Sequence, residues 1–127
     1  MNQATSNPID ENVCDLSYLN EMMGGKKHLI LEIMETFLSQ IPDELKSMNE
    51  AISNIKYSAI KNLAHTMKSS VSIMGIEILR PVLQEMENLG GMETNLEKIT
   101  KLNIQLNSIC KQAINEIIRK KSYYNLA

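Results

Sequence analysis

The sequence contains few aromatic residues, and this shortage is the first guide to its fold class. Of 127 residues, one is Phe, four are Tyr and none is Trp. Nine methionines, with many leucines and isoleucines, supply apolar side chains instead. Strands favour β-branched and aromatic residues, and no segment shows sustained alternation of apolar and polar residues. We therefore expect an all-α protein.

Strong charge of one sign, long apolar runs and paired cysteines are also missing. The formal net charge is −2, so no basic surplus indicates nucleic-acid binding. No apolar stretch approaches the roughly 18 residues of a membrane span, and Met1 to Asp10 show no signal-peptide pattern. Cys14 and Cys110 match no metal-binding spacing and are expected to be packed, reduced thiols. We expect a cytoplasmic monomer that binds no membrane, metal or cofactor.

Apolar residues recur at three- and four-residue steps along most of the chain, which predicts amphipathic helices. Glycines and prolines are scarce, at five and three, and they mark helix ends and one kink. The expected helices are a short one capped by Asp15 and ended by Gly24 and Gly25, a long one over about 30–55 kinked at Pro42, one over 57–74 ended by Gly75, one over 78–89 with Pro81 in its first turn and closed by Gly90 and Gly91, and a last one with a Thr94–Glu97 capping box that frays near Lys120.

Short connections between the long helices favour antiparallel neighbours. The expected architecture is an antiparallel up-and-down four-helix bundle with a short additional N-terminal helix across one end. It would form one domain over residues 13–121, with a flexible segment at 1–12 and a tail at 122–127.

The chain has only two histidines. His28 follows two lysines and is expected to be a solvated surface residue. His65 follows Ala64, which lies on the apolar stripe of its helix, but a step of one residue turns it by about 100°. His65 is therefore expected on the polar face of the helix rather than in the core.

The helical neighbours of His65 suit the chemistry of phosphate. Lys61 and Lys68 lie one turn to either side and could balance the charge of a phosphoryl group on the imidazole. Ser69 and Ser72 are small and leave room for another protein to approach. No Gly-rich phosphate loop is present, so a partner would have to bring the phosphoryl group together with Mg²⁺. On the residues alone, an ordinary surface histidine between lysines remains the alternative.

Residues 64–75 read AHTMKSSVSIMG. This segment resembles the motif of the histidine-containing phosphotransfer (HPt) family of two-component phosphorelays, roughly AHxLKGSxxxxG, with Met67 in place of the usual Leu. The Gly24–Gly25 pair and Pro42 also fall where such domains carry a glycine turn and a proline-bearing helix. The likeness covers about residues 13–90.

The resemblance implies a phosphocarrier with no kinase or ATPase domain of its own. His65 would accept and donate the phosphoryl group through Nε2, and Lys68 would stabilise it. Lys61, Ser69, Ser72 and Gly75 would lie where the partner docks. The partners would be response-regulator receiver domains, a hybrid sensor histidine kinase, or both, and the receiver would hold the Mg²⁺.

One departure from the motif and two other functions bear on this interpretation. The family usually has Gly where Ser69 stands; serine is still small, so we expect transfer to survive with a changed rate or partner choice. A receiver-binding module that moves no phosphate is one alternative. A sensor-kinase dimerisation fragment is another, although Thr66 follows His65 where such kinases usually have an acidic residue.

Overall fold

The computed structural model describes residues 12–125, which form five helices and contain no strand. Most of the segment predicted to be flexible, residues 1–12, lies outside this range. The all-α prediction is confirmed. The helices are α1 (Ser17–Met22), α2 (Lys27–Ser53), α3 (Tyr57–Ile73), α4 (Leu79–Met92) and α5 (Leu96–Asn125).

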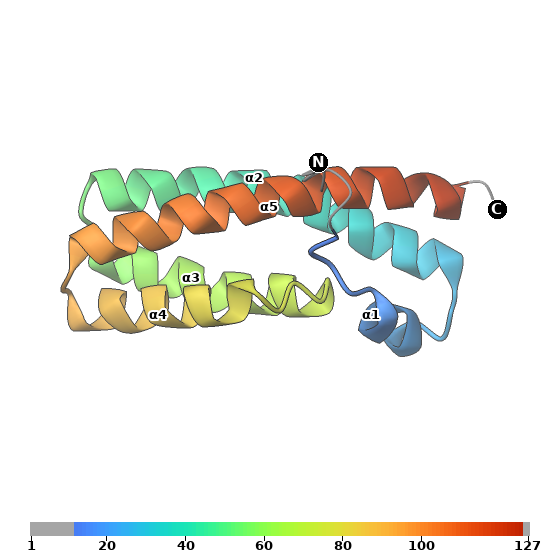
Figure 1. The fold of residues 1–127 in the computed structure, drawn as a ribbon, viewed down its shortest axis with the longest axis horizontal. Helices are drawn as coiled ribbons and strands as arrows, with labels where there is room; N and C mark the ends of the chain where they lie inside the picture. Colours follow the sequence, from blue (N-terminus) through green and yellow to red (C-terminus); the bar gives the residue numbers. More distant parts are fainter. Residues whose placement is uncertain (1–11, 126–127) are drawn as a thin grey trace, which may run out of the picture.

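The four long helices form the bundle, and their unequal lengths leave a place for α1. At 1.5 Å per residue, α2 and α5 are about 40 and 45 Å long, whereas α3 and α4 are about 25 and 21 Å long. In Figure 1, α2 and α5 lie along one side and extend beyond the end of the α3–α4 pair. The short α1 lies in the space beyond the α3–α4 turn, across one end of the bundle, as predicted.

The core is built from aliphatic and methionine side chains, in keeping with the scarcity of aromatics. On α3, Ile60, Ala64, Met67 and Val71 are fully buried at the predicted helical spacing. Cys14 and Cys110 are also buried and form no disulfide. Burial raises the pKa of each thiol from 9.0 to about 12, so both remain protonated thiols at neutral pH.

Two predicted helix ends are wrong. Helix α4 continues through Gly90 and Gly91 to Met92 instead of closing at the glycines, and the left-handed residue after it is Glu93, at φ +53°. The predicted Thr94–Glu97 capping box is replaced by Asn95, whose side-chain oxygen accepts the Lys98 backbone N–H at 3.2 Å. Gly90 lies inside α4 where that helix approaches the backbone of α3 closely, and its missing side chain leaves room for this approach.

The other boundaries agree with the sequence, except the C-terminal end of the last helix. Pro42 lies inside a continuous α2, whose first half slopes away from the line of its second half in Figure 1. Gly24, at φ +62°, and Gly25, at φ +71°, follow α1 as predicted. Helix α5 continues to Asn125, so residues 122–125 are helical and not the predicted tail.

The adjacent glycines of α4 make a matched pair for a stability prediction. A Cβ on Gly90 would lie 2.9 Å from the backbone nitrogen of Lys61, whereas one on Gly91 would lie 3.7 Å from the flexible Lys61 side chain. We expect Gly90→Ala to lower the free energy of unfolding by about 1–3 kcal/mol through overpacking. Gly91→Ala should raise it by about 0.5–1 kcal/mol, because alanine favours the helix. Urea denaturation of the two variants checks this; equal effects would contradict a close α3–α4 crossing at Gly90.

Candidate functional site

His65 lies on the polar side of α3, as its helical phase predicts. The preceding Ala64 is fully buried, while the His65 side chain is 69% exposed. The next turn of α3 carries Lys68 on the same face of the helix, beside α4. The histidine is therefore accessible from solvent yet flanked by a neighbouring helix that can fix its ring.

Glu87 on α4 fixes the orientation of the His65 ring. Its Oε2 lies 3.0 Å from His65 Nδ1. A carboxylate can only accept a hydrogen bond, so the proton of the neutral imidazole resides on Nδ1. The other ring nitrogen, Nε2, then keeps its lone pair and is the ring atom available to act as a nucleophile.

Lys68 completes a charged cluster around the same carboxylate. Its Nζ lies 2.7 Å from Glu87 Oε1 and donates to Gln84 Oε1 at 2.9 Å. The hydrogen bond from Lys68, followed by the one from His65, holds the pKa of Glu87 below its usual value of 4.5. Glu87 is therefore charged at neutral pH. It loses these contacts only as the pH falls through that lowered pKa.

A groove of about 660 Å³ opens beside His65 between α3 and α4. The predicted residues Ser69 and Ser72 line it with small side chains. Its other lining residues are His65, Lys68, Glu77, Arg80, Pro81 and Gln84. The groove thus brings four of the residues singled out from the sequence to one surface.

Two other predicted site residues lie apart from this groove. Lys61 is exposed and lines a separate hollow with Glu87, Asn88 and Gly91. Gly75 lies beyond the end of α3, with φ +65° and its carbonyl accepting the Asp15 backbone N–H at 3.1 Å. His28 is exposed on α2, as predicted.

The sequence reasoning missed Glu87 and Gln84 as site residues. They lie on the helix after that of His65, and their contacts depend on the register of the α3–α4 hairpin. His65 and Glu87 are each 11 residues from Ile76, and Lys68 and Gln84 are each 8 residues from it. Since antiparallel helices advance equally per residue, a hairpin centred on this turn pairs these positions. That symmetry was the signal that could have found them.

Two further findings concern the part of the chain that the structure describes. No group of three or more His, Cys, Asp or Glu side chains within residues 12–125 could hold a metal ion. Over the same range, no helix is long and apolar enough to cross a membrane.

The comparison with protein families identifies the class of this chain. The family model described as Hpt domain matches residues 32–117, more than half of the 127 residues. The chain therefore belongs to the Hpt domain family, and the resemblance read from the His65 segment is confirmed. No curated protein and no solved structure matches the chain.

Membership of the family gives the general function. Hpt domains are phosphotransfer modules of two-component signalling that interact with receiver domains and kinases, and they have no catalytic activity of their own. The match runs from α2 to the last third of α5. Helix α1 and the residues just before it lie outside the matched range.

Proposed function

We propose that this protein shuttles a phosphoryl group between the aspartates of receiver domains in a phosphorelay, carrying it on Nε2 of His65. The observation that supports this most directly is the contact between His65 Nδ1 and Glu87. It leaves a nucleophilic nitrogen on a largely exposed ring beside an open groove. The carboxylate also favours the tautomer in which Nε2 carries no proton.

Transfer requires no cofactor bound by this chain. The Nε2 lone pair attacks the phosphorus of a receiver's aspartyl phosphate in line with the bond to the leaving carboxylate. The N–P bond forms as the P–O bond breaks, and the electron pair of the P–O bond goes to the aspartate carboxylate. The reverse step passes the group to the next receiver. Mg²⁺ held by the receiver neutralises charge on the phosphoryl oxygens.

The neighbours of His65 have separate roles in this proposal. Lys68, on the next turn of the helix, donates hydrogen bonds to the phosphoryl oxygens. Glu87 disperses the positive charge that develops on the ring as the N–P bond forms, because it already accepts the Nδ1 proton. Ser69 and Ser72 keep the groove open for the partner.

The direct test is incubation with receiver domains phosphorylated by acetyl phosphate. We expect the label to move to this protein in an acid-labile, alkali-stable linkage, with ³¹P NMR and peptide mapping placing it on His65 Nε2. A second, unphosphorylated receiver should then remove the label. Receiver binding without any transfer would contradict the proposal and favour a docking module that moves no phosphate.

Glu87 provides a prediction about rate. Glu87→Ala frees the Nδ1 proton to move between ring nitrogens and removes the charge beside the ring, so we expect transfer to slow by about tenfold or more. Glu87→Gln retains an acceptor for Nδ1–H, so its transfer rate should lie between those of the unmodified protein and Glu87→Ala. Glu85→Gln, which breaks an exposed pair with Lys98 on the neighbouring α5, is the control. Quench-flow measurements give the transfer rate of each variant. An unchanged rate in Glu87→Ala would refute the proposal that the tautomer selected by Glu87 speeds transfer.

A further inference from the structure

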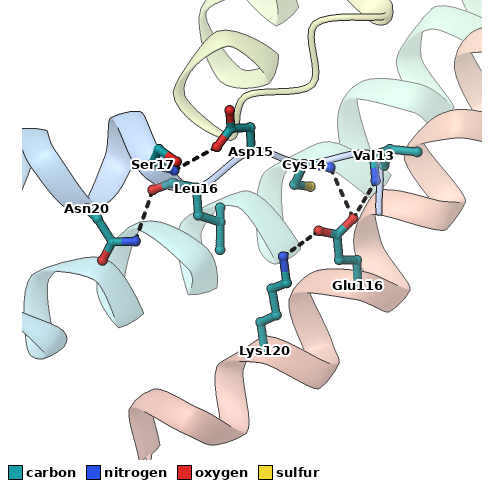
Figure 2. Close-up of polar contacts among 8 residues, drawn as sticks. All are labelled: Val13, Cys14, Asp15, Leu16, Ser17, Asn20, Glu116 and Lys120. Carbon is teal, nitrogen blue, oxygen red and sulfur yellow. Dashed lines mark hydrogen bonds and ion pairs between the residues drawn. The ribbon is translucent and has the colours of Figure 1, made fainter. Parts of the chain in front are cut away.

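Glu116 on α5 is a buried carboxylate with no part in the phosphotransfer chemistry at His65. Its side chain is 1% exposed. Figure 2 shows its partners: Oε1 accepts the backbone N–H groups of Val13 at 2.7 Å and Cys14 at 3.1 Å, and Oε2 lies 2.7 Å from Lys120 Nζ. Burial of a carboxylate is costly unless such groups replace water. Glu116 therefore fastens the start of the described chain to its last helix.

A second anchor lies next to the first along the chain. The Asp15 backbone N–H donates to the carbonyl of Gly75 at 3.1 Å, in the turn between α3 and α4. The two backbones approach so closely that a Cβ on Gly75 would overlap the Asp15 carbonyl. The Asp15 side chain in turn accepts the Ser17 backbone N–H at 3.0 Å just before α1, whose N-cap position is Leu16 and not the predicted Asp15. Residues 12–22, which form the N-terminal strap, are thus tied to α5 and to the α3–α4 turn.

The strap forms one wall of a hollow that continues the His65 groove. This hollow, of about 320 Å³, is lined by Asp15 and Tyr18 of the strap and by Gly75. Ser72, Glu77 and Arg80 complete it, and the same three residues line the groove at His65. The two hollows therefore share a wall and form one docking groove that runs from His65 to the strap.

The two ends of the docking groove differ in charge. At the histidine end, Lys68 supplies a cation, whereas Arg80 lines both hollows and pairs with Glu77 at 3.3 Å on their shared wall. At the strap end, Asp15 supplies an anion, because the hydrogen bond from the Ser17 backbone holds the pKa of its carboxyl below the usual 3.8. Tyr18 beside it is 55% exposed. Exposed tyrosines of this kind are frequent energetic anchors of protein interfaces.

We propose that Glu116 is a positioning residue that holds the strap as the far wall of the docking groove, where Asp15 and Tyr18 contact the receiver domain that exchanges its phosphoryl group with His65. The receiver places its acidic aspartyl phosphate over the end that carries His65 and Lys68, and a lysine or arginine side chain near Asp15. This inference rests on the proposed function. The strap lies outside the range matched by the family, so it extends the docking surface beyond that range.

The test compares Glu116→Ala and Tyr18→Ala with the unmodified protein, using the host receiver domain that transfers to it fastest. We expect each substitution to raise the half-saturating receiver concentration about tenfold. The saturating transfer rate should change by no more than about twofold, because His65 and its neighbours are untouched. Labelling by phosphoramidate, a small donor that needs no docking, should be unchanged. Tyr18 is exposed, so its variant tests the surface without disturbing the fold.

Three controls separate positioning from general stability. Tyr123→Ala removes another exposed tyrosine, on α5, and Glu35→Ala breaks an exposed α2–α5 pair with Lys121; neither should alter transfer. Glu116→Gln keeps an oxygen that accepts the Val13 and Cys14 amides and should restore most of the affinity. Hydrogen exchange at those two amides should accelerate in Glu116→Ala and stay slow in Tyr18→Ala.

The outcomes distinguish this inference from the proposed function. If the strap amides exchange rapidly in Glu116→Ala while the half-saturating receiver concentration of both variants is unchanged, the strap is not part of the docking surface. If the unmodified protein takes no phosphoryl group from phosphoramidate or from any receiver, the proposed function fails and the inference falls with it. Normal transfer by the unmodified protein, together with weakened docking in both variants, supports both.

Discussion

Replacing His65 with glutamine is expected to abolish phosphorylation of this protein by both receiver domains and phosphoramidate. Glutamine has a similar polar reach but no nitrogen with an available lone pair, because its amide electrons are delocalised. The His65 side chain is 69% exposed, so its loss should change the free energy of unfolding by no more than about 0.5 kcal/mol. Autoradiography after receiver-dependent labelling compares His65→Gln with the unmodified protein. Circular dichroism confirms that the variant is folded.

His28→Gln is the matched control for this experiment. His28 is the other histidine of the chain and is also exposed, but it lies near the start of α2 and does not line the docking groove. Its variant should be labelled like the unmodified protein. Acid-labile label that persists in His65→Gln and disappears in His28→Gln would transfer the proposed role from one histidine to the other.

The sequence was sufficient to predict the helices and the exposure of His65, because both follow from local periodicity. A repeat of three and four residues places Ala64 in the core, and a step of about 100° then places His65 outside it. The predicted end of a helix was wrong where that end depended on contacts with a neighbouring helix. Gly90 looked like a terminator, but the structure uses its missing side chain to admit the backbone of α3.

The contacts that complete the site were harder to predict, because each joins residues distant in sequence. Glu87 meets His65 across 22 residues, at a position that hairpin symmetry about Ile76 could have indicated. Glu116 meets Val13 across 103 residues, and no local pattern relates them. The sequence of α5 shows Glu116 only as one charge on an amphipathic helix. Its burial depends on where the strap returns to the bundle.

Gly75→Ala should destabilise the protein more than Gly90→Ala does, because it adds backbone strain to overpacking. Gly75 has φ +65°, a conformation that costs an alanine about 1–2 kcal/mol. A Cβ would also overlap the Asp15 carbonyl oxygen, so the two backbones must separate, at a further cost of about 1–3 kcal/mol. Together these costs should lower the free energy of unfolding, measured by urea denaturation, by about 2–5 kcal/mol.

Gly24→Ala isolates the conformational part of this loss. Gly24 has nearly the same φ, +62°, but a Cβ there meets nothing within 4 Å, so its variant should lose only about 1–2 kcal/mol. The loss in free energy of unfolding in Gly75→Ala, minus the loss in Gly24→Ala, measures how firmly the strap is held. In a Glu116→Ala background the strap is already loosened, and Gly75→Ala should then cost little more than Gly24→Ala. The loss in free energy of unfolding of the Glu116→Ala/Gly75→Ala double variant should therefore be smaller than the sum of the two single losses by about 1 kcal/mol or more. Strict additivity would mean that Glu116 and Gly75 do not hold the same segment, and that the wall of the docking groove at Asp15 and Tyr18 is fixed in some other way.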